Sequence, residues 1–581
     1  MASNGDTKRV WTIDGTTVKG LGSFHKTLPH PNPYGEVDVD AFDCLVAATE
    51  GDGSGFAGVP KGPQRDSKHP TFQLINPQAG LAADELTHHP ASYSMPPAPK
   101  VDSITTAAEM TELYWMALLR DCGFNELGKE ASDAVTDINK NFTAAVDDEE
   151  GNDAGHLKRG IDVPGSTRSF TSFTADTVFR LGLPGEMQGP MLSQFFVRDI
   201  AYGTQSISQK QNPYASGKDY LTKFADWLGA QNSGNDAAGH AYNRANEDSD
   251  ARFEKDKNGN LATRYICTMR DLARFVNKDA LHQAYFNAAL ILLSGQAKWT
   301  PGNPYDVRLA DREAGFGVLG GPHILALVSE IATRALKVVW NQKWQVNLRL
   351  RPEAYGGLVQ VQECGVDGKT RSYGIPPSLV ETEAAKRILK NNGSYLLPMA
   401  YTPGSPTHPA YGAGHATVAG ACVTVLKAYF KTFTTDKEGN VHPVFFNTLK
   451  EREDPFGDGG MIATYETGRK KDGTFDRIPL DAKIAESLTI EGELNKLAQN
   501  VAMGRSMGGV HWRTDNTRSL ILGEALAAEI LADITTDANE KPSFEFRTFA
   551  RDKDGEPRRV KIANGRIWVN EVLVDTHGSA L

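Results

Sequence analysis

Two histidines, His408 and His415, lie seven residues apart in the stretch S-P-T-H-P-A-Y-G-A-G-H-A-T-V-A-G. The two prolines exclude regular helix at the start of this stretch. The small and apolar residues that follow predict a closely packed helix to about residue 430. Gly414 and His415 are therefore expected at a helix N-terminus, where backbone N–H groups and the helix dipole favour an anion. A histidine placed there can exchange a proton with a bound oxyanion.

Two other segments carry side chains of complementary chemistry. One is the end of a helix predicted over residues 322–344 and the chain just beyond it, where a proline favours extended backbone for the arginine before it. The other is G-R-S-M-G-G-V-H-W-R-T-D. Brought together, they would surround a tetrahedral oxyanion with charge-assisted donors and imidazoles. The residues concerned are Lys343, Arg351, Arg505, His511 and Asp515.

Each of these residues also has an ordinary structural interpretation. Lys343 or Arg351 alone is typical of a surface or helix-capping charge, His408 of a loop residue, and His511 beside Trp512 of a structural histidine. What favours a chemical site is the conjunction, since all three segments occur in one order with consistent internal spacing.

Composition excludes some functional classes. The 581 residues have a net charge of −10, which argues against nucleic-acid binding and against an anionic membrane surface. No apolar run approaches the roughly 20 residues of a membrane-spanning helix, and the first residues do not resemble a secretory signal. The five cysteines lack metal-type spacing, which favours free thiols.

The chain pattern predicts a mainly α protein with minor β-hairpins near its termini. Residues 1–100 are expected to form an extended arm with a short hairpin turning at Asp14-Gly15. Residues 101–540 form the predicted helical domain, with a polar insertion at 431–485. Residues 541–581 alternate like a terminal β-hairpin segment. The predicted helices cover 103–122, 134–146, 218–230, 266–293 (one helix or a pair), 322–344, 414–430, 489–507 and 514–534.

An acidic loop near residue 310 has two interpretations. Asp306, Asp311 and Glu313 are close in sequence, as in a solvated loop or an oxygen-ligand calcium site. Their spacing matches no named calcium-binding loop, so both interpretations remain open.

The three segments resemble the K-x(6 or 7)-R-P, P-S-G-H and S-R-x5-H-x3-D motifs of vanadium-dependent haloperoxidases and the related acid phosphatases. Between the motifs, W-N-Q-K-W-Q-V-N-L-R-L-R-P-E-A-Y-G-G-L-V and G-G-V-H-W-R-T-D are similar to bromoperoxidases of red algae and cyanobacteria. The likeness is dense over residues 320–530. It implies helical bundles of the haloperoxidase/acid phosphatase type with the site at the end of one bundle.

The resemblance implies roles for the residues of the motifs, at positions 340–352, 408–415 and 504–515. Arg351, Arg505 and Lys343 are expected to bind vanadate oxygens, and Lys343 also to polarise peroxide. His511 is expected to ligate vanadium. Asp515 would orient that ring, as metal-ligating histidines usually need.

The second motif is expected to supply the acid/base chemistry. The backbone N–H of Gly414 would bind vanadate, and His415 would move the proton. His408 stands where bromoperoxidases have His and fungal chloroperoxidases have Phe. Trp340 would line the halide side. The family's Ser is Ala413 here, so one hydroxyl donor to vanadate is missing, which predicts weaker binding and not loss of the site.

The function implied is a vanadate-dependent bromoperoxidase that oxidises bromide or iodide with hydrogen peroxide and halogenates a small organic acceptor. The resemblance also implies a homo-oligomer, often a dodecamer in relatives, and in some relatives a structural calcium. An acid phosphatase with His511 as nucleophile is the alternative enzyme, against which chain length and His408 argue. A non-catalytic binding protein is disfavoured because all three cations are present.

Overall fold

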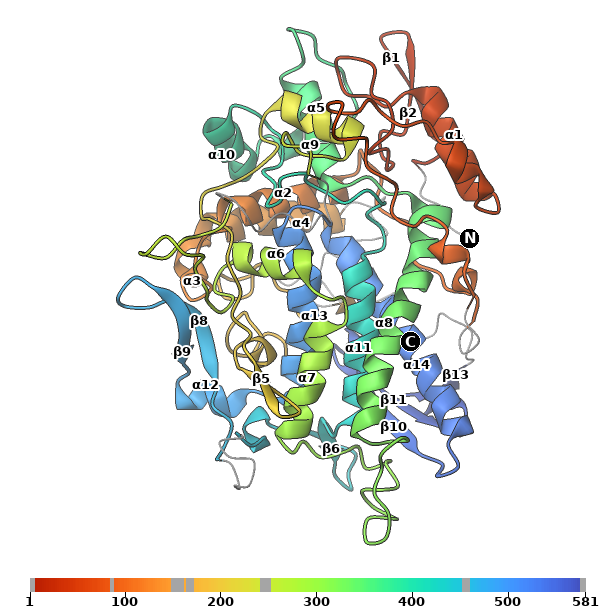
Figure 1. The fold of residues 1–581 in the computed structure, drawn as a ribbon, viewed down its shortest axis with the longest axis vertical. Coiled ribbons are helices and arrows are strands. Elements are labelled where there is room, and N and C mark those ends of the chain that lie inside the picture. The colour runs from red at the N-terminus through yellow and green to blue at the C-terminus, as the bar shows by residue number, and fades with distance from the viewer. Residues whose placement is uncertain are drawn as a thin grey trace.

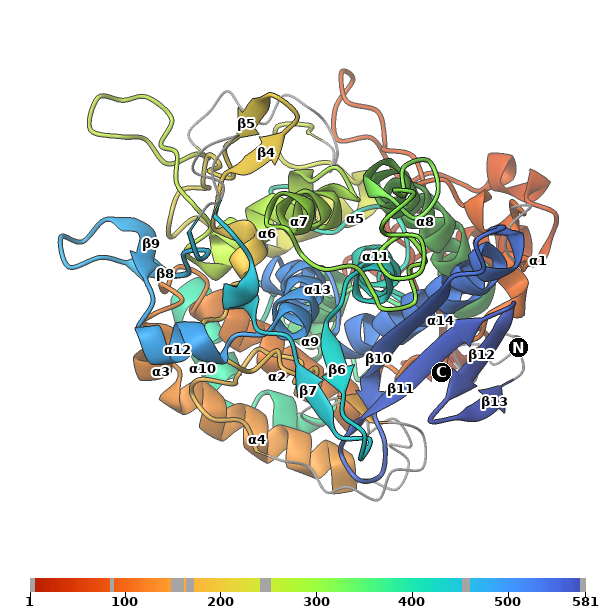
Figure 2. The same cartoon turned by 90° about the horizontal axis from the view of Figure 1, so that it is seen from below.

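A bundle of long helices forms the centre of the molecule (Figure 1). The computed structural model describes residues 6–83, 88–147, 161–162, 172–240, 252–451 and 460–574. Seen along their axes, α8, α13 and α14 surround α11 (Figure 2). The bundle helices are α7 (Gln283–Ser294), α8 (Gly321–Asn341), α11 (Gly414–Tyr429), α13 (Ile490–Met507) and α14 (Arg513–Asp537).

Small residues let α11 lie at the centre. Every residue of this helix except His415 is buried. A Cβ added to Gly420 would lie 2.2 Å from the carbonyl oxygen of Leu520, and one added to Gly523 would lie 2.0 Å from that of Thr417. The backbones of α11 and α14 therefore approach more closely than larger residues would allow.

The predicted helices before the bundle are α2 (Ile104–Leu118), α4 (Ser132–Asp147) and α5 (Phe224–Ser233). Residues 266–293 form a pair, α6 (Met269–Lys278) and α7, because the chain turns to extended backbone at Asp279. Three further helices were not predicted from the sequence: the short α3 (Leu127–Glu130), α9 (Pro352–Glu363) and α10 (Glu383–Asn392). None of the described helices is long and apolar enough to cross a membrane.

The N-terminal arm begins with the hairpin of β1 (Val10–Ile13) and β2 (Thr16–Lys19). The prediction that the rest is extended chain is wrong, because it contains α1 (Val39–Glu50). Asp38 caps this helix through a 2.9 Å hydrogen bond from the amide of Ala41. Its buried face packs with Trp344 of the body in a small apolar cluster.

Strands occur throughout the chain, and not only near its ends. The C-terminal strands β10 (Ser543–Arg551), β11 (Pro557–Ala563), β12 (Arg566–Val569) and β13 (Val572–Val574) pair in order, and β3 (Ile161–Asp162) adds to β10 in parallel. This sheet packs on α14 and α11 (Figure 2). The mainly α class therefore holds only roughly. The remaining elements are the hairpin of β4 (Ile200–Tyr202) and β5 (Gln205–Ile207), that of β6 (Phe433–Thr435) and β7 (Val441–Pro443), that of β8 (Tyr465–Arg469) and β9 (Phe475–Pro479), and α12 (Ala482–Ser487).

Candidate active site

The three motif segments meet at one end of the bundle. There α8 and α13 end, and α9, α11 and α14 begin. After α8 the chain makes a π-helical turn over Gln342–Asn347 and reverses at Leu348, whose φ is +48°. Pro352 opens α9 and leaves Arg351 extended as its N-cap, as its sequence predicts. Lys343 and Arg351 therefore approach the start of α11 from the same side.

Lys343 and Arg351 hold the loop that precedes α11. Lys343 Nζ donates to the carbonyl oxygens of Pro409 and Ala410, at 2.8 and 3.2 Å. Arg351 donates to the carbonyl oxygens of His408 and Pro409, at 2.9 and 3.1 Å, and to His408 Nδ1 at 3.0 Å. Both cations are buried. The carbonyls they bind fix their heads beside the two histidines.

His511 is held between an acid and a cation. Its Nδ1–H donates to Asp515 Oδ2 at 2.9 Å, and Arg351 Nη1 lies 3.0 Å from its Nε2. Burial lowers the pKa of His511 well below its usual value, and the charges of Arg351 and Lys343 lower it further. With its proton on Nδ1, the ring presents the Nε2 lone pair, which accepts the N–H of Arg351 here and which a Lewis acid would take instead when bound.

Arg349 and Glu109, which the sequence analysis missed, hold Asp515 in place. Arg349 donates to Asp515 Oδ1 at 2.7 Å and to Glu109 Oε2 at 2.8 Å, and its guanidinium lies 4.9 Å from the Trp512 ring. Because one oxygen of Asp515 is tied to Arg349, the other stays aimed at His511. The alternation of arginines in L-R-L-R-P was the only sequence signal for Arg349. Glu109 gave no such signal, because it lies in α2, far away in the chain.

The start of α11 carries the second histidine. Gly414 is the first residue of the helix, where backbone N–H groups lack intrahelical acceptors. His415 Nε2 lies 3.0 Å from Asp279 Oδ1, so Nε2–H donates to that carboxylate. Asp279, at the break between α6 and α7, is another residue that sequence reasoning missed. Ala413 is the N-cap and makes no side-chain cap; its amide donates to Ser519 Oγ at 2.8 Å.

Part of this site lines one wall of a cavity of about 630 Å³. Trp340 lies in that wall with its ring centroid 4.9 Å from the ring of His408, and its indole N–H donates to Ile75 of the N-terminal arm at 3.2 Å. Asp515, Lys343 and Arg351 lie behind the wall. The predicted residues that line the cavity are Trp340, His408, Gly414, His415, Arg505 and His511.

Positive charge accumulates at this wall. Burial lowers the pKa of Lys343 well below its usual value, Arg351 and Arg505 lower it further, and Asp515 opposes them. Burial, Lys343, Arg351 and Arg505 lower the pKa of His408 in the same way. Arg505 is fixed by a 2.7 Å hydrogen bond to the carbonyl oxygen of Val276. A bound anion would relieve the mutual repulsion of these groups.

The acidic loop does not assemble into a site in the described structure. Asp306, Asp311 and Glu313 are exposed side chains on a loop before α8, and the described residues contain no group of three or more acidic, histidine or cysteine side chains arranged to hold a metal ion. Calcium at this loop stays a prediction from the resemblance.

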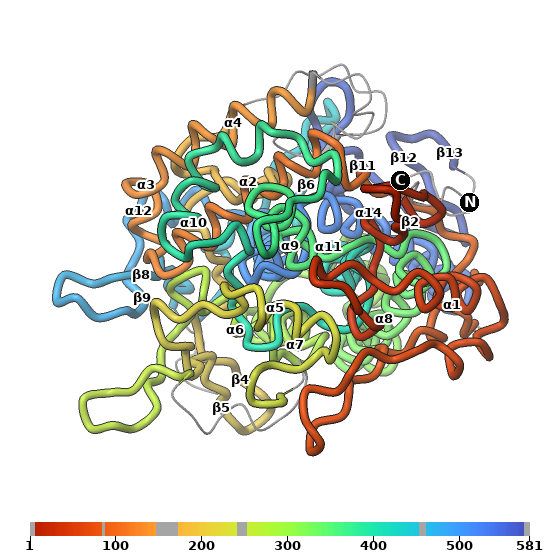
Figure 3. Tube along the Cα trace, turned by 90° about the horizontal axis from the view of Figure 1, so that it is seen from above, coloured from red at the N-terminus to blue at the C-terminus, as the bar shows by residue number. Residues whose placement is uncertain are grey.

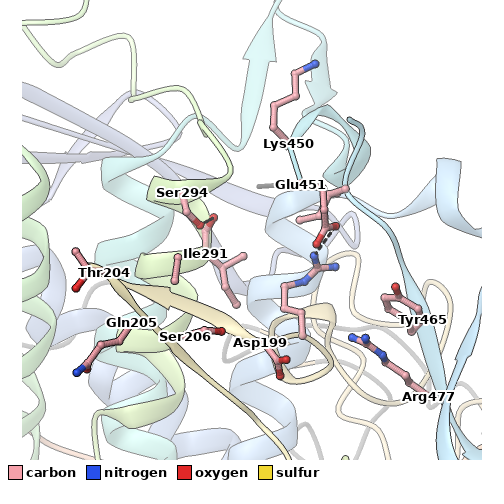
Figure 4. A pocket seen from close by; sticks show the side chains of 14 residues that line it. Asp199, Thr204, Gln205, Ser206, Ile291, Ser294, Lys450, Glu451, Tyr465 and Arg477 are labelled. Carbon is pink, nitrogen blue, oxygen red and sulfur yellow. Dashed lines mark hydrogen bonds and ion pairs between the residues drawn. The ribbon is translucent and has the colours of Figure 1, made fainter. Parts of the chain in front are cut away.

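A second pocket, of about 560 Å³, lies beside the β4–β5 hairpin (Figure 4). Arg198 there pairs with Glu451 at 3.3 Å, and Arg477 donates to the carbonyl oxygen of Val197. This pocket contains none of the predicted site residues. The cavity at the start of α11, which the predicted site residues line, is therefore the candidate active site.

Known proteins are similar to this chain in sequence. The family model of the VCPO second helical-bundle domain matches residues 325–539. The vanadium-dependent bromoperoxidase of Corallina pilulifera is 32% identical over 92% of this chain and 91% of its own length, and that of Corallina officinalis is 32% identical over 91% and 89%. The chain belongs to the vanadium-dependent bromoperoxidase family. It is an enzyme of that type.

A solved bromoperoxidase also matches the fold. The homohexameric second vanadate-dependent bromoperoxidase of Ascophyllum nodosum aligns with a TM-score of 0.71 and 26% identity, over 99% of this chain and 88% of that one. The likeness therefore includes the arm and the terminal sheet of this bromoperoxidase as well as its bundle.

The donor set of this bromoperoxidase fits vanadate. A vanadate oxyanion needs cations and N–H donors around its oxygens and one neutral nitrogen toward its central atom. The site combines the buried basic side chains Lys343, Arg351 and Arg505, a helix N-terminus and Nε2 of His511. Ala413, which has no hydroxyl to donate, argues against tight binding.

Proposed function

We propose that this bromoperoxidase binds vanadate at the start of α11 and uses it to oxidise bromide, or iodide, with hydrogen peroxide. The observation that carries the proposal is the neutral, Asp515-oriented His511 beside the buried cations Lys343 and Arg351. Vanadate, when bound there, supplies a Lewis-acid centre that activates peroxide toward halide. Lys343, Arg351, Arg505 and the N–H of Gly414 would hold its oxygens, and His511 Nε2 its vanadium.

The reaction needs a supply of protons, and we assign this role to His415. Bromide, hydrogen peroxide and one proton give hypobromous acid and water, so each turnover consumes a proton. Asp279 accepts the Nε2–H of His415 at 3.0 Å, which leaves Nδ1 to take up and release that proton. His415 is one-fifth exposed (19%), which allows reprotonation from solvent.

Trp340 and His408 form the side of the cavity that we assign to halide. The rings lie 4.9 Å apart, and Lys343 Nζ lies 5.4 Å from the Trp340 ring centroid. A halide ion in this corner would meet a cation and polarisable rings. The apolar part of the cavity, with Leu281 and Leu336, leaves room for a small organic acceptor of the oxidised halogen.

The assay that tests this function is bromination of a phenol-red type dye by metal-free protein with peroxide and bromide, with and without added orthovanadate. We expect dye bromination only in the presence of vanadate. Bromination that does not depend on vanadate, or hydrolysis of a phosphate ester without bromination, would refute the proposal. The phosphatase alternative uses the same oxyanion site, but none of the relatives named above favours it.

His511→Ala tests the ligand assignment. The variant keeps the cations but removes the nitrogen donor, so vanadate binding and bromination should be lost together. Both are measured on one preparation, by isothermal titration with orthovanadate and by the dye assay. Retained vanadate-dependent bromination would contradict the role of His511.

We also propose that the enzyme is a homo-oligomer. The support is the homohexameric Ascophyllum relative. The dodecamer suggested by the resemblance and calcium at Asp306, Asp311 and Glu313 are separate predictions. Light scattering after size exclusion measures the number of chains, and metal analysis before and after chelation measures bound calcium.

A further inference from the structure

Loop 403–410, which carries His408, is held by cations at both of its ends. At its C-terminal end Lys343 and Arg351 bind the carbonyl oxygens of residues 408–410. At its N-terminal end Lys26, from the N-terminal arm, donates to the carbonyl oxygens of Pro403 and Ser405 at 2.7 and 2.8 Å. Figure 3 shows the arm, in red, crossing the end of the bundle beside α8 and α11.

Lys26 is neutralised by a carboxylate next to the site. Its Nζ lies 2.8 Å from Glu353 Oε1, and the two side chains are only 3% and 1% exposed. Glu353 lies two residues after Arg351 in the first turn of α9. Its other oxygen accepts the amide N–H of Ser405, and Gln231 donates to Oε1 at 2.6 Å. Lys26 therefore joins the arm, the loop and the helix that Arg351 caps.

The geometry at Gly404 shows how closely these groups fit. Gly404 has φ +70°, and a Cβ added there would lie 2.0 Å from Glu353 Oε2. The arm also binds the middle of the loop at Thr407. Thr407 Oγ1 donates to the carbonyl oxygen of Gln73 at 2.6 Å, and the amide N–H of Ile75 donates to the carbonyl oxygen of Thr407 at 3.0 Å. The loop has no regular secondary structure of its own, so these contacts determine where His408 and the carbonyls that bind Lys343 lie.

We propose that Lys26 is a positioning residue of the active site, which acts through loop 403–410 on His408, Lys343 and Arg351. The ammonium group of Lys26 makes three hydrogen bonds, to Glu353 and to the carbonyl oxygens of Pro403 and Ser405. These bonds hold the loop in place, as a helix or strand would otherwise do. The expected effect on vanadate binding rests on the proposed vanadate site. The expected effect on the order of loop 403–410 rests on the loop contacts alone.

Lys26→Met is the direct test, and Arg371→Met is its matched control. Arg371 also forms a buried ion pair between arm and body, at 2.9 Å from Glu36, with side chains 5% and 2% exposed. Each substitution removes one buried cation and leaves one buried carboxylate, but the partners of Arg371 are Glu36, Asp14 and Tyr34, all outside loop 403–410. A general effect of a loosened arm would therefore appear in both variants.

Two measurements are made on the full chain. We expect Lys26→Met to weaken orthovanadate binding by about tenfold in isothermal titration and to raise amide hydrogen exchange in the peptide covering 403–410. Arg371→Met should change neither by more than about twofold. Equal effects of the two variants, or no effect of Lys26→Met on exchange, would overturn the proposal.

Two more variants separate positioning from folding. Lys26→Met combined with Glu353→Gln removes the unpaired buried charge, so thermal stability should recover while vanadate binding stays weak. Lys26→Arg, which keeps the charge and donors, should restore both. Recovery of vanadate binding in the double variant would contradict the role of Lys26. Absence of vanadate binding by the wild type would instead refute the proposed function, and the exchange experiment would still decide the loop proposal.

Discussion

At the scale of single residues, the site depends on buried charges whose partners are mostly backbone atoms. Lys343 and Arg351 bind carbonyl oxygens of one loop, and Arg505 that of Val276. Such bonds fix the position of each basic group beside the cavity, whereas Asp515 and Arg349 form a buried ion pair with each other.

Ala413→Ser restores a hydroxyl at the N-cap of α11. That oxygen can accept a backbone N–H of the first helical turn and donate its proton to a vanadate oxygen. We expect unfolding of the metal-free protein to cost about 1 kcal/mol more, and vanadate to bind about 2- to 10-fold more tightly, from the ~0.5–1.5 kcal/mol of one neutral hydrogen bond.

The two effects are measured separately, by urea unfolding without vanadate and by isothermal titration with it. Stabilisation without tighter binding would mean that the hydroxyl only caps the helix. In that case Ala413 would not explain any weakness of vanadate binding in this chain.

The identity of the motif residues could be predicted from the sequence because their types and spacing carry the chemistry. The residues that support them could not. Glu109 and Asp279 come from helices far away in the chain, and Arg349 and Lys26 look like ordinary basic residues without their partners. Long-range pairing depends on the packed fold, which short-range patterns do not encode.

At the scale of elements, the helices place each group by where they begin and end. Their existence was predictable from apolar periodicity, as for α11, α13 and α14. The helix α1 was missed because the Pro- and Gly-rich composition around it suggested extended chain, although the N-cap Asp38 and the apolar residues Phe42 and Leu45 were visible signals. Contact between β3 and β10 could not be predicted, because two residues carry no recognisable strand pattern.

Gly523→Ala tests the close contact between α14 and α11. The new Cβ would lie 2.0 Å from the carbonyl oxygen of Thr417, so the two helices must separate. We expect a loss of about 1–3 kcal/mol in the free energy of unfolding, the usual cost of overpacking, and weaker vanadate binding because Gly414 and His511 move apart.

Gly321→Ala is the control, since a Cβ there would meet only Leu293, at 3.9 Å. It should be neutral or slightly stabilising. Calorimetric melting of both variants measures the difference. Equal stability of the two would contradict the close-packed arrangement of α11 and α14.

At the scale of the whole molecule, the N-terminal arm contains buried polar side chains. Two of these form a histidine pair, with His25 Nδ1 2.8 Å from His30 Nε2. Burial lowers the pKa of His30 to about 4. An unfolded chain, with an ordinary histidine pKa near 6.5, binds this proton more readily. Stability from the neutral ring is therefore present above pH about 6.5 and is lost as pH falls toward 4.

His30→Gln removes this titration while keeping a polar side chain. Between pH 6 and 4, the unfolding free energy of the wild type should fall more steeply than that of the variant, by up to about 1.4 kcal/mol per pH unit and about 3 kcal/mol in all. Urea unfolding at several pH values measures both slopes. Parallel slopes would contradict the assignment of this pH dependence to His30.

The most direct test of the vanadate site is an anomalous difference map from crystals of this enzyme soaked in orthovanadate, recorded at the vanadium absorption edge. We expect one peak per chain in the cavity at the start of α11, within bonding distance of His511 Nε2 and enclosed by Lys343, Arg351 and Arg505. A peak elsewhere, or none at this wall in protein that brominates, would contradict the account.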